Sequence, residues 1–217
     1  MSRSALPEEL VGVVLAGGRS SRMGKDKPAL RLYGEGRPDL LSRTMALLRD
    51  CTAEVWVSCR REQTMPGCRC IHDLEEDLGP IGGIVSTLTE LARSPRRAAL
   101  VLSCDLPFMN GSLLSRLINA RRSAKPGALM TTFRQAETGY IEALVAIYEQ
   151  EALPFFEQAL AVQLRQLNLV LRPNQRTEVS YTRREALPFF NINYPADLET
   201  ARQLIAALDP DPALKIL

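Results

Sequence analysis

The sequence predicts a three-layer α/β fold, in which helices cover both faces of a mostly parallel, Rossmann-like sheet. Short apolar runs typical of buried strands alternate along the chain with segments of helical periodicity. The runs at 10–15 and 98–103 are almost continuously apolar, as expected of strands covered on both faces. The second half is less regular, and we expect it to add one antiparallel strand.

Length and composition favour a single domain spanning residues 1–217. The net charge of +2 is too near balance to indicate binding to nucleic acid or to a membrane surface. The longest apolar runs fall short of the roughly 20 residues that span a bilayer, and the N-terminal segment does not resemble a signal peptide. The five cysteines, an odd number without a secretory signal, indicate reduced thiols and a cytoplasmic protein.

The order of elements divides the domain into two halves. In the first half, about 10–125, we expect strands at 10–15, 54–58, 68–72 and 98–103, and helices at 39–49, 84–93 and 112–122. In the second half, about 126–208, we expect strands at 129–133, 141–148, 178–181 and 189–192, and helices at 151–160 and from Pro195 onward. Residues 209–217 are expected to be a loose tail, and 160–187 shows no motif.

The stretch that organises the chain runs from Val11 to Leu30. An apolar run breaks at Ala16-Gly17-Gly18 and becomes polar and cationic, with Arg22 and Lys27 among its basic residues. Glycines let backbone N–H groups converge on an anion, so this pattern is typical of a phosphate-binding loop. It matches neither the P-loop nor the dinucleotide-binding fingerprint.

Other candidate residues follow the predicted strands. Asp73 follows the strand at 68–72, Asp105 follows the strand at 98–103, and a second glycine-rich break begins at Gly79. Because ligands bind beyond the carboxyl ends of parallel strands, these groups are expected to converge. Asp105 offers the oxygen ligand that Mg²⁺ prefers. The combination favours metal-assisted transfer at phosphorus.

Four segments resemble, in the right order, the motifs of one family. The chain carries LAGGRSSRMGKDK at 15–27, GPIGG at 79–83, SCDLP at 103–107 and FFNINYP at 189–195. These segments are similar to motifs of the nucleotidyltransferases, and within them to the molybdenum cofactor guanylyltransferases. The resemblance implies a Mg²⁺-dependent enzyme that joins GMP from GTP to molybdopterin and releases pyrophosphate, and that could work with other cofactor-synthesis proteins and molybdoenzymes.

The resemblance also implies roles for individual residues. Arg22, Lys27 and Asp105 would be catalytic, and Asp105 would hold the metal. Asn191 and Asn193 would contact the pterin. The nucleotide would be bound by Leu15, Ala16, Gly17, Gly18, Lys27, Ser58, Asp73, Gly79 and Asp105. Two positions depart from the pattern: Ser58 replaces an asparagine found in several relatives, and Glu142 stands where relatives often have proline or a small residue.

Several alternatives remain open at this point. The reaction could instead be cytidylyl transfer from CTP to the same pterin, or the chain could be a non-catalytic nucleotide-binding relative. Asn193 could simply cap the last helix. Cys68, Cys70 and His72 alternate on a predicted strand and could bind a metal, although the spacing is not that of a usual zinc site.

Overall fold

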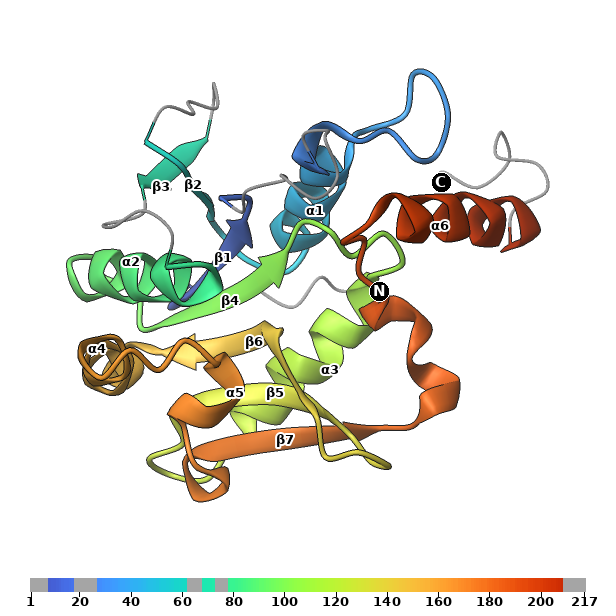
Figure 1. Cartoon of the computed structure of the whole chain (residues 1–217). Helices are drawn as coiled ribbons and strands as arrows, with labels where there is room; N and C mark the ends of the chain where they lie inside the picture. Colours follow the sequence, from blue (N-terminus) through green and yellow to red (C-terminus); the bar gives the residue numbers. More distant parts are fainter. Residues whose placement is uncertain (1–7, 18–26, 62–67, 73–77, 209–217) are drawn as a thin grey trace.

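A seven-stranded sheet forms the middle layer of this computed structural model, which describes residues 8–17, 27–61, 68–72 and 78–208 (Figure 1). The strand order is β3-β2-β1-β4-β6-β5-β7. Only β6 runs against the other strands, because it pairs antiparallel with both β4 and β5 while the remaining pairs are parallel. The predicted fold class and its single antiparallel strand are confirmed.

The strands occupy nearly the predicted places. They are β1 (Leu10–Leu15), β2 (Val55–Cys59), β3 (Arg69–His72), β4 (Ala98–Ser103), β5 (Met130–Gln135), β6 (Ile141–Glu149) and β7 (Arg176–Tyr181). The central strand β4 is buried at every residue, which explains why its sequence is apolar up to the final Ser103. The parallel pairing of β7 with β5 was not predicted.

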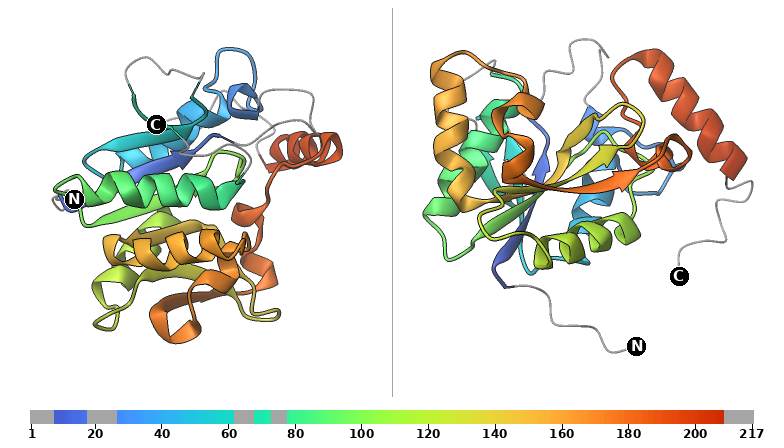
Figure 2. Two further views of the ribbon diagram at one scale, coloured as in Figure 1. Left: turned by 60° about the vertical axis from the view of Figure 1, so that its left-hand side comes forward. Right: turned by 90° about the horizontal axis from the view of Figure 1, so that it is seen from below.

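Helices cover both faces of the sheet. They are α1 (Leu40–Arg49), α2 (Pro80–Ala92), α3 (Gly111–Arg122), α4 (Leu153–Ala161), α5 (Leu167–Val170) and α6 (Pro195–Leu208). One core joins α1 and α3 to the first face, and a second core joins α2, α4 and α5 to the other. Figure 2 shows α2 and α4 side by side on that second face. Short 3-10 turns lie at Lys27–Ala29, Gln150–Ala152, Pro173–Gln175, Arg183–Glu185 and Leu187–Phe189.

The helix starts follow local rules. Asp39 caps α1, since its Oδ1 accepts a hydrogen bond of 2.7 Å from the backbone N–H of Ser42. Asn110 caps α3 by accepting from the backbone N–H of Leu113. The prediction that α2 begins at residue 84 was wrong: it begins at Pro80, whose fixed φ suits the first helical position.

The strand expected at 189–192 does not form. Pro188 lies in the 3-10 turn Leu187–Phe189, and the N–H of Ile192 donates to the backbone oxygen of Asp105 at 3.0 Å instead of to a neighbouring strand. Ile192 then packs with Leu198 of α6 in a small third core. This contact brings the approach to α6 against the end of β4.

Candidate active site

The ends of three parallel strands define one edge of the sheet. Leu15 of β1 lies opposite both Ser58 of β2 and Ser103 of β4. The pairing continues past the strands, because the N–H of Ala16 donates to the oxygen of Ser58 at 2.8 Å. Residues 15–17 therefore leave the sheet beside the segment that carries Asp105. Ser58 is only 1% exposed, so its hydroxyl is enclosed at this edge.

Asp105 follows β4 and its carboxylate is held in place from two sides. The hydroxyl of Ser103 donates to its Oδ1 at 2.7 Å, and the ammonium of Lys27 lies 3.5 Å from its Oδ2. The side chains of Lys27 and Asp105 are 18% and 15% exposed. A cation and an anion thus face a partly desolvated edge, where their charges act more strongly on a ligand than they would in water.

Lys27 also connects this edge to the C-terminal segment. Its Nζ donates to Oδ1 of Asn193 at 3.0 Å. Asn193 does not cap α6 with its side chain; Asp197 reaches back instead and accepts from the backbone N–H groups of Asn193 and Tyr194, both at 2.8 Å. Three predicted site residues that are far apart in the sequence, Lys27, Asp105 and Asn193, are therefore in contact.

Gly79 lies immediately before α2, at the edge of the same site. Its φ of +69° and ψ of −155° fall in a region that only glycine adopts readily, whereas a Cβ would meet no atom within 4 Å. The glycine is therefore required by the backbone conformation, not by lack of space. Among the described residues no side chain caps α2, so its first turn presents backbone N–H groups that suit an anion.

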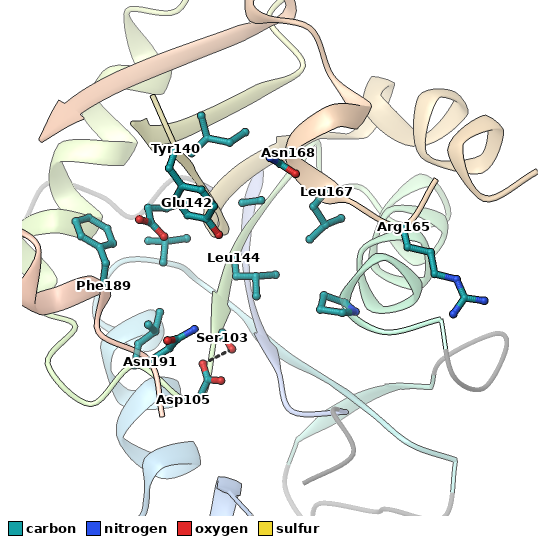
Figure 3. A pocket seen from close by; sticks show the side chains of 15 residues that line it. Ser103, Asp105, Tyr140, Glu142, Leu144, Arg165, Leu167, Asn168, Phe189 and Asn191 are labelled. Atoms are coloured by element: carbon teal, nitrogen blue, oxygen red, sulfur yellow. Dashed lines mark hydrogen bonds between the residues drawn. The ribbon is translucent and has the colours of Figure 1, made fainter. Parts of the chain in front are cut away.

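A cavity of about 200 Å³ opens beside Asp105 on the side of β6. Ser103, Asp105, Phe189 and Asn191, all in predicted motifs, line it together with Glu142, which departs from the family pattern. Tyr140, Arg165 and Asn168 also line it, and the sequence analysis did not place these three in the site. Figure 3 shows Glu142 between Phe189 and Tyr140, with Asn191 and Asp105 at the lower end. Tyr140 and Glu142 could have been noticed as polar residues at the start of an apolar strand.

Glu142 is the unusual group in this cavity. The hydroxyl of Tyr181 donates to its Oε1. Burial raises the pKa of Glu142, and the hydrogen bond from Tyr181 opposes that shift. Burial and the neighbouring charge of Glu142 raise the pKa of Tyr140 as well. At this position the sequence showed only a departure from the family pattern.

Three predicted site residues, Gly18, Arg22 and Asp73, lie outside the described residues. The described part of the chain contains no group of three or more His, Cys, Asp and Glu side chains arranged to hold a metal ion. Near β3, His72 Nδ1 lies 4.0 Å from Cys59 Sγ, and Cys68 Sγ lies 3.8 Å from the sulfur of Met45. The alternative of a metal site at Cys68, Cys70 and His72 therefore finds no support there.

Comparison with known proteins identifies the family. The family model described as the MobA-like NTP transferase domain matches residues 12–179. The chain belongs to this family. A molybdenum cofactor guanylyltransferase of Xanthomonas euvesicatoria is 34% identical over 188 residues, which cover 85% of this chain and 89% of that protein. Another from Pseudomonas entomophila is 29% identical over 164 residues, covering 73% of this chain and 80% of that protein.

A solved structure agrees with this assignment at the level of the fold. The molybdopterin-guanine dinucleotide biosynthesis protein A of Archaeoglobus fulgidus superposes with a TM-score of 0.71 at 24% identity, covering 91% of this chain and 99% of that one. The MobA-like chain is thus a nucleotidyltransferase, as the motifs predicted. In the residues that the structure describes, no helix is long and apolar enough to span a membrane.

Proposed function

We propose that this MobA-like protein transfers GMP from GTP to molybdopterin with the help of Mg²⁺ and releases pyrophosphate. The observation that carries the proposal is the contact of Lys27, Asp105 and Asn193 at the carboxyl edge of the sheet, in a chain of this family. Reduced thiols at the five cysteines would be consistent with a cytoplasmic enzyme. Protein partners that supply or receive the cofactor belong to the same proposal.

The nucleotide would occupy the side of β1 and α2. Residues 15–17 end β1 at the surface of the site, and the uncapped first turn of α2 after Gly79 offers N–H groups to phosphate oxygens. Lys27 adds a positive charge between this loop and Asp105. By family resemblance, Gly18, Arg22 and Asp73 would complete the nucleotide site.

In the proposed reaction, an oxygen of the terminal phosphate of molybdopterin forms a bond to the α-phosphorus of GTP. The bond from that phosphorus to the β-phosphate oxygen breaks, and pyrophosphate leaves with its electron pair. A phosphate nucleophile is already anionic near neutral pH, so no general base is needed. Lys27 stabilises charge on the transferring and leaving phosphates, and Asn193 holds its ammonium in place.

The donor set at Asp105 suits a magnesium ion carried by the nucleotide. Mg²⁺ in such sites takes one or two carboxylates together with substrate phosphates and water, so the carboxylate of Asp105 suffices as the protein ligand. Ser103 would orient that carboxylate through its 2.7 Å hydrogen bond. When bound, the ion would neutralise charge on the phosphates.

Nucleotide binding and product formation test the proposal. Calorimetric titration with GTP, CTP, ATP and UTP, each with Mg²⁺, should show tightest binding of GTP. Incubation with GTP and molybdopterin should then release pyrophosphate and give the dinucleotide by mass spectrometry. A preference for CTP in both assays would replace the proposal with cytidylyl transfer. Bound GTP without any pyrophosphate release in the presence of molybdopterin would instead indicate a binding protein.

A further inference from the structure

The cavity beside Asp105 lies mainly on the β6 side of β4, although Pro80 of α2 also lines it. β1 flanks β4 on one side and β6 flanks it on the other. Val145 of β6 pairs with Leu102 of β4, so the first residues of the antiparallel β6 pass the end of β4 where Asp105 follows. Glu142 therefore lies next to the reacting edge but away from the loop at 15–17.

The Glu142 side chain is held firmly. Tyr181, which donates to Oε1, is only 3% exposed and packs against Phe189 with ring centroids 4.3 Å apart. The backbone oxygen of Glu142 accepts a hydrogen bond of 3.0 Å from Thr132. A carboxylate offers about four acceptor positions on its two oxygens, and Tyr181 uses one of them.

Among the described residues, Glu142 forms no ion pair with a cation. The ion pairs of neighbouring cations involve other acidic side chains. The titratable side chains next to it are Tyr181, which donates to it, and Tyr140. Arg165 also lines the cavity, but Figure 3 shows its guanidinium turned away from Glu142. A partly buried acid without a cationic partner costs stability, so such a group in a cavity indicates a ligand that supplies hydrogen-bond donors.

We propose that Glu142 selects the acceptor by binding the 2-amino-4-oxo edge of its pterin ring. This edge carries adjacent N–H donors, which match the two oxygens of a carboxylate. Phe189, next to Glu142 in the wall of the cavity, supplies an apolar surface for the ring (Figure 3). The volume of about 200 Å³ is below the ~300–1,000 Å³ of sites that enclose whole ligands, so it suits one ring system. The inference rests on the proposed function, which supplies the pterin.

Guanine carries the same donor edge, so two ligands of the proposed reaction could satisfy Glu142. The position of Glu142 favours the acceptor. Glu142 belongs to β6, and β4 separates it from the end of β1 at 15–17, while the first turn of α2 reaches the cavity through Pro80. The experiment therefore measures both ligands.

The test combines a change in the protein with a change in the ligand. Binding of pterin and of pteridin-4-one, which lacks the 2-amino group, is measured by fluorescence titration for the wild type, Glu142→Gln and Glu157→Gln. Glu157 is an exposed glutamate of α4 and provides the matched control. Glutamine keeps an acceptor for Tyr181 but places an N–H group against one donor of the ligand.

We expect the wild type and Glu157→Gln to bind pterin about 10- to 100-fold more tightly than pteridin-4-one, as is typical of a bidentate pair. Glu142→Gln should bind both compounds about equally, and its affinity for GTP should stay within twofold of the wild type. The inference would be overturned if the wild type bound pterin and pteridin-4-one equally, or if Glu142→Gln still preferred pterin. So would a weakened affinity for GTP with unchanged pterin binding, which would assign Glu142 to guanine.

Pyrophosphate release separates this inference from the proposed function. If the wild type forms the guanine dinucleotide and Glu142→Gln does so with the same KM for molybdopterin, the inference fails while the function stands. If pterin binding depends on Glu142 but no pyrophosphate is released, the function fails while the binding role of Glu142 stands.

Discussion

Substituting Asp105 by asparagine removes a charge from the centre of the site while it preserves the shape of the side chain. Ser103 can still donate to the amide oxygen, and the backbone oxygen of Asp105 still accepts from Ile192 at 3.0 Å. The contact that ties the approach of α6 to β4 is therefore unchanged. The fold should survive the substitution, so any loss of rate would come from the lost carboxylate.

The effect on stability can be bounded from the geometry. Two charges 3.5 Å apart, as between Lys27 and Asp105, attract with about 5 kcal/mol at an effective dielectric constant near 20. Desolvation of both groups offsets most of this attraction. We therefore expect the free energy of unfolding to fall by only about 1–2 kcal/mol, which chemical denaturation would measure.

The effect on rate should be much larger. Loss of one preorganised charge typically costs about 10²–10³ in kcat. Asp105 both holds Lys27 and offers the proposed metal ligand, so we expect the upper end, about 10³-fold, in pyrophosphate release with GTP, Mg²⁺ and molybdopterin. Asp39→Asn is the matched control, because asparagine caps α1 as well as aspartate does and the contact of the Asp39 carboxylate is this cap, to the N–H of Ser42.

Two results would refute this reasoning directly. If Asp105→Asn keeps more than about a tenth of the wild-type kcat, the carboxylate supplies less than the ~2.7–4 kcal/mol expected of such a charge, and it is not the metal ligand. If the rate falls only in proportion to the folded fraction, Asp105 acts on stability alone.

Three further substitutions probe the framework around the site. Asn193→Ala removes an acceptor of Lys27, so kcat for pyrophosphate release should fall about tenfold, and Asn193→Asp should recover part of it; an unchanged kcat would contradict the positioning role. Arg121→Met breaks the two hydrogen bonds of 2.7 and 2.8 Å to Glu149, so unfolding in urea should show a loss of about 2–3 kcal/mol, with the rate per folded molecule unchanged. Gly12→Ala would place a Cβ 2.8 Å from a threonine hydroxyl in the tight contact of β1 with α1, and should cost about 1–3 kcal/mol in the same assay; a smaller loss would show that the contact yields.

The fold was largely predictable because its signals are local. Five of the six buried residues of β4 form a continuous apolar run, and Asp39, Asn110 and Pro195 mark helix starts by their own chemistry. The parallel β5–β7 pair was not predictable, because β6 and α4 lie between the two strands in the sequence. The last stretch before β7 carries only the brief α5 and a short turn, neither of which indicates a return to the sheet edge.

The contact of Lys27 with Asp105, at the proposed nucleotide site, was predictable for a related reason. Lys27 and Asp105 lie in motifs that a single sequence displays in full, and the rule that parallel strands end at one edge brings them together. The proposed acceptor site could not be predicted in the same way, because its residues meet only through tertiary packing. Glu142 and Tyr181 are 39 residues apart, and only the neighbouring places of β6, β5 and β7 bring them into contact.

The segment at 189–195 shows how a wrong secondary structure can preserve the correct functional spacing. No strand forms there, yet the segment keeps the twofold alternation of a strand: Ile192 is fully buried in the third core, while Asn191 lines the cavity and Asn193 contacts Lys27. One hydrogen bond, from the N–H of Ile192 to the backbone oxygen of Asp105, takes the place of a ladder. The two asparagines thus face the same edge, one toward the proposed acceptor and one toward the lysine of the proposed nucleotide site. Their spacing by two is therefore explained by a single extended segment that reaches both the cavity and Lys27.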